Sequence, residues 1–193
     1  MFVDGFPYSI REEYKNVISV ISYRTINNVS VGVQDAYNSE KESYSLFDGT
    51  DIKFPYRIYF VDDESIYEKL TSIEKMVYDC IFTRSCDGYI REKHLLNLLN
   101  TEIPEWCMPY ILRLSSEYVV EIIALIYDSL IYKDNDMVQA FCYNNPKQLK
   151  RSYQRMVSYW NEYYRNQYPK FRDYIGRKLF RECFAPRTNF EKI

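Results

Sequence analysis

Aromatic rings and basic side chains are concentrated near the C-terminal end of the chain, where they could bind a polyanion or a protein. The stretch SYWNEYYRNQYP, residues 158–169, contains five aromatic rings in twelve residues. Basic residues flank it on both sides, in KQLKR before it and KFRDYIGRK after it. Tyrosine rings can stack on unpaired bases while arginines bind the neighbouring phosphates. The same residue types also form patches at which proteins dock.

Helical spacing separates these rings into two groups. One group recurs at steps of three and four residues and is expected to face a core: Leu149, Tyr153, Met156, Trp160 and Tyr164. The other rings lie off that apolar face, in a helix predicted over residues 146–167. The sequence therefore assigns partner binding to five residues off the apolar face: Arg151, Arg155, Tyr159, Tyr163 and Arg165.

A polar stripe crosses the most apolar predicted helix, residues 109–132. It consists of Arg113, Glu117 and Glu121. Two glutamates four residues apart could act as acid–base groups or as metal ligands. A carboxylate-bridged metal site in a helical bundle needs E-x-x-H pairs, and the only histidine, His94, has no such context. We therefore expect a structural role, in which Arg113 pairs with Glu117 at i,i+4 spacing, and we expect His94 to be a half-buried polar residue.

The segment around Asp87-Gly88 resembles the centre of a calcium-binding loop but lacks the acidic ends of one. Thr83 and His94 occupy the first and twelfth loop positions, where Ca²⁺ requires carboxylates. We expect instead a tight turn in which Gly88 adopts a positive φ. The five cysteines form no C-x-x-C pair, and no phosphate-binding loop or nucleophile elbow occurs. The sequence predicts no metal, cofactor or catalytic residue, and favours a binding protein over an enzyme.

The predicted helices 71–84 and 91–100 also resemble the first half of a winged-helix domain. Such a domain reads duplex DNA with an exposed basic helix that follows this pair. Here residues 110–132 follow, and they are apolar, with one arginine against three acids before Tyr132. This composition argues against the reading of duplex DNA.

The elements that must position these residues are expected to be mainly helices. Of the 193 residues, 47% are hydrophobic, and only 5 are glycine and 7 proline, which favours long packed elements in one domain. Capping patterns and apolar periodicity predict helices over residues 10–24, 71–84, 91–100, 109–132, 146–167 and 172–184. Residues 27–51 are predicted to be a loop. Within residues 52–61, Pro55 allows at best a short edge strand. The expected fold is a mostly α, single-domain bundle of residues 1–193 around a buried helix at 109–132.

Two capping boxes support the first helices of this prediction. Ser9 precedes Glu12, and Thr71 precedes Glu74, each at the spacing at which the two side chains bond reciprocally to the helix N-terminus. Asn145 followed by Pro146 predicts the start of the basic helix.

Charge is distributed unevenly along the chain. Residues 146–193 contain 12 lysines and arginines against 4 acidic residues, a net charge of +8, while residues 1–145 have a net charge of −10. The basic end could bind a polyanion, or the two parts could attract each other within the fold. We favour the second explanation. The leading functional prediction is therefore a protein that binds another protein, and the alternative is single-stranded nucleic-acid binding through residues 146–167.

Cysteine usage and the N-terminal residues indicate the compartment. The cysteine count is odd, and MFVDGFPYSIREE lacks the basic start and the apolar run of a signal peptide. No stretch is long and uncharged enough to cross a bilayer. We expect a cytoplasmic protein with free thiols and no membrane association. The sequence does not define the oligomeric state.

Three stretches resemble an uncharacterised family of bacterial proteins. They are Asp87 to Arg91, then Trp106 to Pro109 with Glu117 to Ile122, and last Ser158 to Arg165. They resemble the family patterns D-G-x-[IV]-R, W-x-x-P with E-Y-V-x-E-I, and S-Y-W-x-x-Y-Y-R, over about residues 52–180. The resemblance implies a bacterial origin and a single domain, and it implies no activity, cofactor or catalytic residue.

Overall fold

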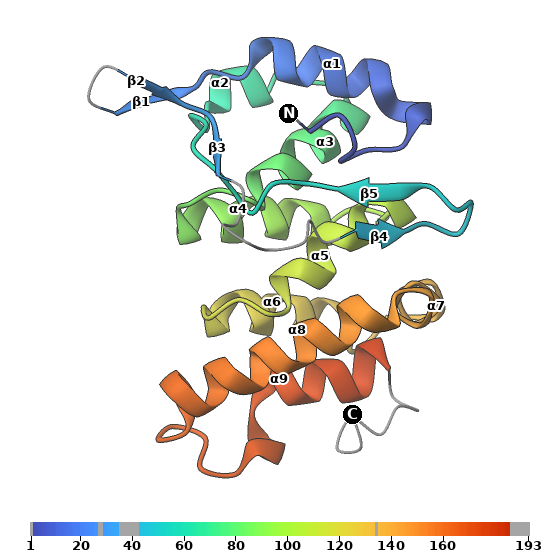
Figure 1. Ribbon diagram of the computed structural model, residues 1–193, viewed down its shortest axis with the longest axis vertical. Coiled ribbons are helices and arrows are strands. Elements are labelled where there is room, and N and C mark those ends of the chain that lie inside the picture. The colour runs from blue at the N-terminus through green and yellow to red at the C-terminus, as the bar shows by residue number, and fades with distance from the viewer. Residues whose placement is uncertain (1, 27–28, 35–42, 134, 186–193) are drawn as a thin grey trace. The chain divides into compact units, whose positions relative to one another are not determined.

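A computed structural model describes residues 2–26, 29–34, 43–133 and 135–185 of the chain (Figure 1). The protein is mostly α-helical, as the composition predicts. Its contacts divide the chain into two compact units. The N-terminal unit comprises residues 1–44 and 49–107, and the C-terminal unit comprises residues 45–48 and 108–193. The single domain that the sequence predicts stays a prediction.

Four α-helices belong to the N-terminal unit: α1 (Arg11–Val20), α2 (Glu64–Tyr67), α3 (Ser72–Phe82) and α4 (Gly88–Leu99). Helix α3 packs against both α1 and α4. Its last six residues, from Val77 to Phe82, are all buried. The capping box at Thr71 and Glu74 is confirmed, because Glu74 N–H donates to the Thr71 hydroxyl and Thr71 N–H donates to the Glu74 carboxylate.

Three other predictions of local structure in this unit are wrong. A 3-10 turn at Tyr8–Ile10 precedes α1, so Ile10 takes the N-cap position and the Ser9 capping box does not form. The helix also ends at Val20 rather than near Arg24. Gly88 is the first residue of α4, where the Asp87 carboxylate accepts from Tyr89 N–H, and it does not adopt a positive φ. Asp87 therefore caps a helix rather than lining a calcium loop.

Short strand pairs occupy part of the region predicted as loop and edge strand, and β1–β2 and β3–β6 are antiparallel. The strands are β1 (Arg24–Ile26), β2 (Val29–Val31), β3 (Val33–Gln34), β4 (Ser43–Ser45), β5 (Asp51–Lys53) and β6 (Arg57–Ile58). They pair as β1 with β2, β3 with β6, and β4 with β5. Pro55 lies between β5 and β6, as its missing N–H requires. The rest of the predicted loop, at residues 27–28 and 35–42, lies outside the described residues.

Helices also build the C-terminal unit: α5 (Met108–Leu114), α6 (Val120–Leu130), α7 (Asp136–Asn144), α8 (Pro146–Tyr159) and α9 (Ile175–Lys178). A 3-10 turn, Phe171–Asp173, precedes α9, and a π-helical segment, Leu179–Phe184, continues it. Helices α8 and α9 lie side by side (Figure 1). Every residue of α5 is buried, so the expected buried element is present.

The helix predicted over 109–132 is, however, two helices. Serine hydroxyls explain the break, because they bond to the last carbonyls of α5 and compete with helical continuation. Ser115 Oγ donates to Leu112 O at 2.7 Å, and Ser116 Oγ donates to Arg113 O at 3.1 Å. A turn and a bend follow, and Val119 adopts an extended conformation as the N-cap residue of α6.

Candidate functional site

Three tyrosines form a cluster on the C-terminal unit, which we call the tyrosine cluster. Tyr118 lies in the α5–α6 connection, Tyr159 ends α8, and Tyr163 follows one turn later. The ring centroids of Tyr118 lie 6.3 Å from Tyr159 and 6.4 Å from Tyr163, and those of Tyr159 and Tyr163 are 6.1 Å apart. Tyr118 is 50% exposed and Tyr163 is 61% exposed. The chain therefore holds large apolar rings together at the surface.

A π-helical segment positions the second half of this cluster. Helix α8 passes into a π-helix at Trp160–Tyr164. A π turn inserts an extra residue into the helical repeat, and such segments occur frequently at functional sites. Trp160, the first residue of this segment, is half-buried. Its ring centroid lies 4.7 Å from that of Phe171, and its indole N–H donates to Tyr168 O at 2.9 Å.

The predicted apolar face is thus confirmed only in its α-helical part. Leu149, Tyr153 and Met156 are buried. Trp160 and Tyr164, in the π-helical segment, are half-buried and pack against Phe171 and Tyr174.

The Tyr164 hydroxyl holds the backbone on both sides of Val119, next to Tyr118 of the tyrosine cluster. It donates to Tyr118 O at 2.6 Å and accepts from Val120 N–H at 3.2 Å. Burial raises the pKa of Tyr164, so the hydroxyl stays protonated and keeps both bonds. The connection that carries Tyr118 is therefore tied to the π-helical segment.

Next to the cluster lies a shallow hollow, which we call the arginine hollow. It has a volume of about 320 Å³, and its lining residues are Arg151, Gln154, Arg155, Ser158 and Tyr159. Tyr159 belongs to both the hollow and the cluster. Four of the five residues predicted to bind a partner thus meet on one surface of the C-terminal unit. The fifth, Arg165, is exposed and donates to Asn161 Oδ1 at 3.2 Å.

The three residues of the predicted polar stripe do not share one helix face. Arg113 and Glu117 are buried, whereas Glu121 is exposed in the first turn of α6. Arg113 belongs to α5, whereas Glu117 lies in the connection that follows this helix. The expected pairing of Arg113 with Glu117 stays a prediction. The Arg113 guanidinium donates to Ser116 Oγ at 3.1 Å.

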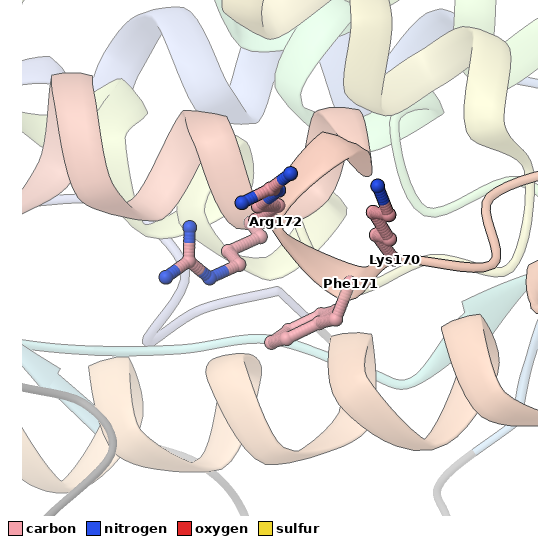
Figure 2. A pocket seen from close by; sticks show the side chains of 4 residues that line it. Lys170, Phe171 and Arg172 are labelled. Carbon is pink, nitrogen blue, oxygen red and sulfur yellow. The ribbon is translucent and has the colours of Figure 1, made fainter.

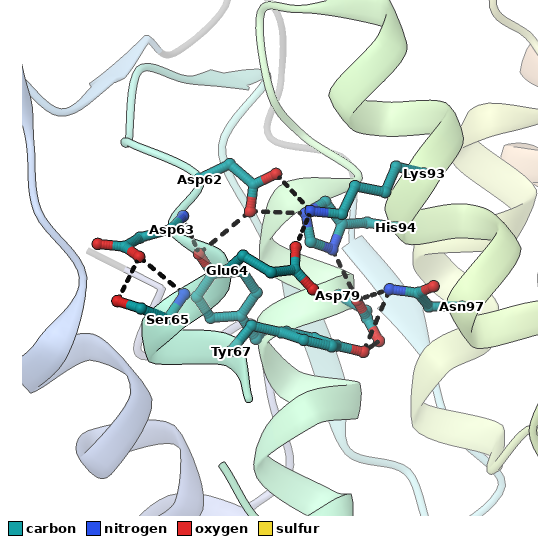
Figure 3. A network of polar contacts seen from close by, with 10 residues as sticks. Asp62, Asp63, Glu64, Ser65, Tyr67, Asp79, Lys93, His94 and Asn97 are labelled. Carbon is teal, nitrogen blue, oxygen red and sulfur yellow. Dashed lines mark hydrogen bonds and ion pairs between the residues drawn. The ribbon is translucent and has the colours of Figure 1, made fainter. Parts of the chain in front are cut away.

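A second group of polar residues lies inside the N-terminal unit and centres on His94 (Figure 3). We call it the His94 cluster. The side chain of His94 is fully buried rather than half-buried, with Nδ1 2.6 Å from Asp79 Oδ1 and Nε2 3.0 Å from Asp62 Oδ1. Lys93 Nζ lies 3.0 Å from Asp62 Oδ2 and 2.6 Å from Glu64 Oε2.

Hydroxyl and amide groups complete the bonding of both aspartates. Tyr67 donates to Asp79 Oδ2 at 3.0 Å, and Asn97 donates to Asp79 Oδ1 at 3.1 Å. Tyr78 donates to Asp62 Oδ1 at 3.3 Å and accepts from Asp63 N–H at 3.0 Å. Each buried charge therefore has an opposite charge and neutral donors around it.

This arrangement shifts the pKa values toward the charged forms. Burial alone lowers the pKa of His94, but the hydrogen bonds and negative charges of Asp62 and Asp79 outweigh it, and the pKa is raised. Burial alone raises the pKa of Asp62, yet His94 and Lys93 lower it to about 2. Nδ1 of His94 forms a hydrogen bond with Asp79, whereas Nε2 lies within ion-pair distance of Asp62 without the geometry of a hydrogen bond. The full burial of the His94 ring favours a structural role for the cluster.

Sequence reasoning missed the His94 cluster. Its members come from the segment before α2, from α2, from α3 and from α4, and no short spacing links Asp62 and Asp79 to His94. The packing of α3 against α4 brings Asp79 and His94 together.

Metal and thiol chemistry have little support within the described part of the chain. No group of three or more His, Cys, Asp or Glu side chains there could hold a metal ion. All five cysteines are free, and Cys80 Sγ lies 3.5 Å from Cys107 Sγ in the buried interior of the N-terminal unit. Burial raises the pKa of the Cys80 thiol well above its usual value, which disfavours the reactive thiolate.

Comparisons of the chain with protein-family models, with curated proteins and with solved structures gave no match. The resemblance to an uncharacterised bacterial family stays a prediction. None of the described helices combines the length and the apolar character that a membrane crossing requires.

Proposed function

We propose that this protein acts by binding another protein, through the tyrosine cluster and the arginine hollow of its C-terminal unit. One observation carries the proposal: Tyr159 belongs both to the tyrosine cluster and to the arginine hollow, so three tyrosines and two arginines meet on one surface. Tyrosine and arginine are enriched among the residues that dominate the binding energy of protein interfaces. Two arginines in one hollow favour a partner segment that carries carboxylates.

Preorganisation supports this surface as a docking site. Tyr164 ties the Tyr118 backbone to the π-helical segment, so two separate parts of the chain hold their rings in place before a partner arrives. Side chains that are already ordered lose less conformational entropy on binding. The same proposal places the protein in the bacterial cytoplasm, where its five free thiols would persist.

Ring geometry favours a protein over single-stranded nucleic acid as the partner. The Tyr118 ring is inclined by 71° to Tyr159 and by 52° to Tyr163. Rings that meet edge to face occupy one another's surfaces, whereas stacked bases need open, roughly parallel faces. The net charge of the whole chain is −2, which gives no general attraction to a polyanion.

The proposal is tested by identifying a partner and then weakening it at defined residues. Affinity purification from the native cell, with nuclease-treated and untreated halves, would supply the partner for direct titration. We expect Tyr118→Ala/Tyr163→Ala to weaken its binding by about tenfold or more, since truncated hot-spot residues cost about 2 kcal/mol or more. We expect Arg151→Ala/Arg155→Ala to weaken it as well, and more strongly at low salt.

The matched control is Tyr8→Ala/Tyr132→Ala, because these tyrosines are 81% and 94% exposed and belong to neither feature. It should leave the affinity unchanged. A fluorescent single-stranded oligonucleotide provides the contrary arm. Binding of that probe at about 1 µM or tighter in physiological salt, lost in Tyr118→Ala/Tyr163→Ala, would refute protein binding in favour of nucleic-acid binding.

A further inference from the structure

The tyrosine cluster presents hydrogen-bond donors as well as aromatic rings. Tyr118 and Tyr163 are at least half exposed. Within the part of the chain that the structure describes, neither of their hydroxyl groups forms a hydrogen bond with another group. Both hydroxyls can therefore donate to carbonyl oxygens of a docked segment without losing a bond inside this protein.

The spacing of the three rings suits a segment in the polyproline II conformation. The ring centroids lie 6.1, 6.3 and 6.4 Å apart. A polyproline II helix has three residues per turn and rises about 3.1 Å per residue, so one turn of about 9 Å would span all three rings. Its backbone forms no internal hydrogen bonds, so its carbonyl oxygens can accept from tyrosine hydroxyls.

Other modes of peptide binding have less support at this surface. Addition of a β-strand requires an exposed strand edge, whereas the three tyrosines lie in α8, in the π-helical segment and in the α5–α6 connection. An amphipathic helix docks in a hydrophobic groove, whereas arginine, glutamine and serine line the hollow beside the cluster. Proline-rich segments dock on surfaces that aromatic side chains line.

From these observations we infer that the tyrosine cluster binds a proline-rich segment of the partner in the polyproline II conformation. The inference rests on the proposed function, in which the arginine hollow receives carboxylates of the same segment. Tyr164 already holds the backbone next to Tyr118, and a polyproline II segment is already extended. Both sides therefore lose little conformational entropy on binding.

A second basic hollow on the C-terminal unit provides a charge-matched comparison. It is lined by Lys170, Phe171, Arg172 and Arg177, and its volume is about 470 Å³ (Figure 2). Its aromatic residue, Phe171, packs against Trp160 with a centroid distance of 4.7 Å. An acidic peptide that is attracted by charge alone would be affected by substitutions in either hollow.

The test measures the binding of fluorescein-labelled peptides to the full chain by fluorescence anisotropy in physiological salt. The first peptide has a run of about six prolines, two turns of the helix, between two pairs of glutamates. In the second, glycines and serines replace the prolines, and in the third, alanines and leucines replace them so that an amphipathic helix can form. All three peptides have the same net charge.

We expect a dissociation constant of about 100 µM or tighter for the proline-rich peptide, and binding of the other two that is weaker by about tenfold or more. Equal or tighter binding of the glycine–serine peptide would indicate attraction by charge alone. Equal or tighter binding of the third peptide would indicate the docking of a helix. Either result, or no saturable binding of the proline-rich peptide, would overturn the inference.

Variants locate the bound peptide. Tyr118→Ala/Tyr163→Ala should weaken the binding of the proline-rich peptide by about tenfold or more. Tyr118→Phe/Tyr163→Phe keeps the rings and removes the hydroxyl bonds, so it should weaken binding by a smaller factor. Lys170→Ala/Arg172→Ala removes two positive charges from the second hollow and should leave the affinity unchanged. Equal losses in this variant and in Tyr118→Ala/Tyr163→Ala would also overturn the inference.

Failure of the inference differs from failure of the proposed function. A purified protein partner that loses affinity in Tyr118→Ala/Tyr163→Ala, while the unaltered protein does not bind the proline-rich peptide, would refute the inference and leave the proposed function in place. If neither the partner nor the peptide depends on these two tyrosines, both fail.

Discussion

The His94 cluster differs in burial from the surface that the tyrosine cluster and the arginine hollow form together, although both regions contain tyrosines and charged side chains. In the His94 cluster, two aspartates enclose one imidazole at 2.6 and 3.0 Å, and tyrosine hydroxyls complete their bonding. On the C-terminal unit, tyrosine rings and arginines meet at a surface hollow instead. Buried charged groups that pair with one another stabilise the unit, whereas side chains that meet at a surface can also contact a partner.

Burial decides between these two roles. A charged group removed from water costs free energy unless a partner and hydrogen bonds compensate it, so the buried set must be complete. Surface side chains carry no such requirement, because water can complete the bonding that protein groups leave open. Substitutions should therefore reduce stability in the first region and binding in the second.

The largest expected effect is on the buried region. His94→Ala leaves Asp62 and Asp79 without the charge between them, and breaking a buried pair in this way costs about 3–5 kcal/mol. We expect a loss of that size in the free energy of unfolding, measured by urea denaturation. Lys93→Ala, at a partly exposed amine, should cost less than about 1 kcal/mol. Equal effects of the two substitutions would show that the His94 cluster is not closed.

A smaller loss of stability is expected at Gly176 of α9, which packs against Met156 on the buried side of α8. A methyl group added at Gly176 would lie 2.7 Å from both Met156 Cγ and the Tyr174 ring. Overpacking of a core costs about 1–3 kcal/mol, so Gly176→Ala should lower the melting temperature while a bound partner is retained. Loss of the partner at unchanged stability would contradict the separation of the two faces of α8.

Deprotonation of His94 should reduce the free energy of unfolding by less than the His94→Ala substitution does, because the ring stays in place. The pKa of His94 is raised in the folded state above the value of about 6.5 expected for the unfolded chain. Its stabilising contribution is therefore complete below pH 6.5 and is lost as the pH rises through the folded pKa. The pKa of Asp62 is lowered to about 2 in the folded state. The charged Asp62 carboxylate therefore contributes to the free energy of unfolding in full above about pH 3.9, and this contribution is lost as the pH falls toward 2.

Denaturation between pH 5.5 and 9 measures this decline. The chain has one histidine, so its ring signal in the proton NMR spectrum is assigned without further variants. A titration midpoint at or below pH 6.5 would contradict the paired, charged state of His94.

The smallest effect on stability is expected at the surface. Tyr163 is 61% exposed, and substitutions at such positions usually change the free energy of unfolding by no more than about 0.5 kcal/mol. Tyr163→Ala should therefore unfold at nearly the same urea concentration as the unaltered protein. A loss above about 2 kcal/mol would mean that the tyrosine cluster belongs to the core.

Local chemistry made much of the fold predictable. Thr71 with Glu74 marks the start of α3, and Asn145 with Pro146 marks the start of α8, because capping and proline stereochemistry depend on residues only a few positions apart. The Ser9 box shows the limit of such patterns, since a 3-10 turn took its place.

The sequence by itself determined that the protein is mostly helical, and it selected Arg151, Arg155, Tyr159 and Tyr163, because helical periodicity separates an apolar face from the rest. Only the tertiary structure decided that Tyr118 joins them and that His94 lies between two aspartates. These contacts join residues 15 to 45 positions apart or depend on a π turn that no spacing rule encodes. Periodicity describes one helix at a time, whereas contacts between elements follow from how their buried faces pack together.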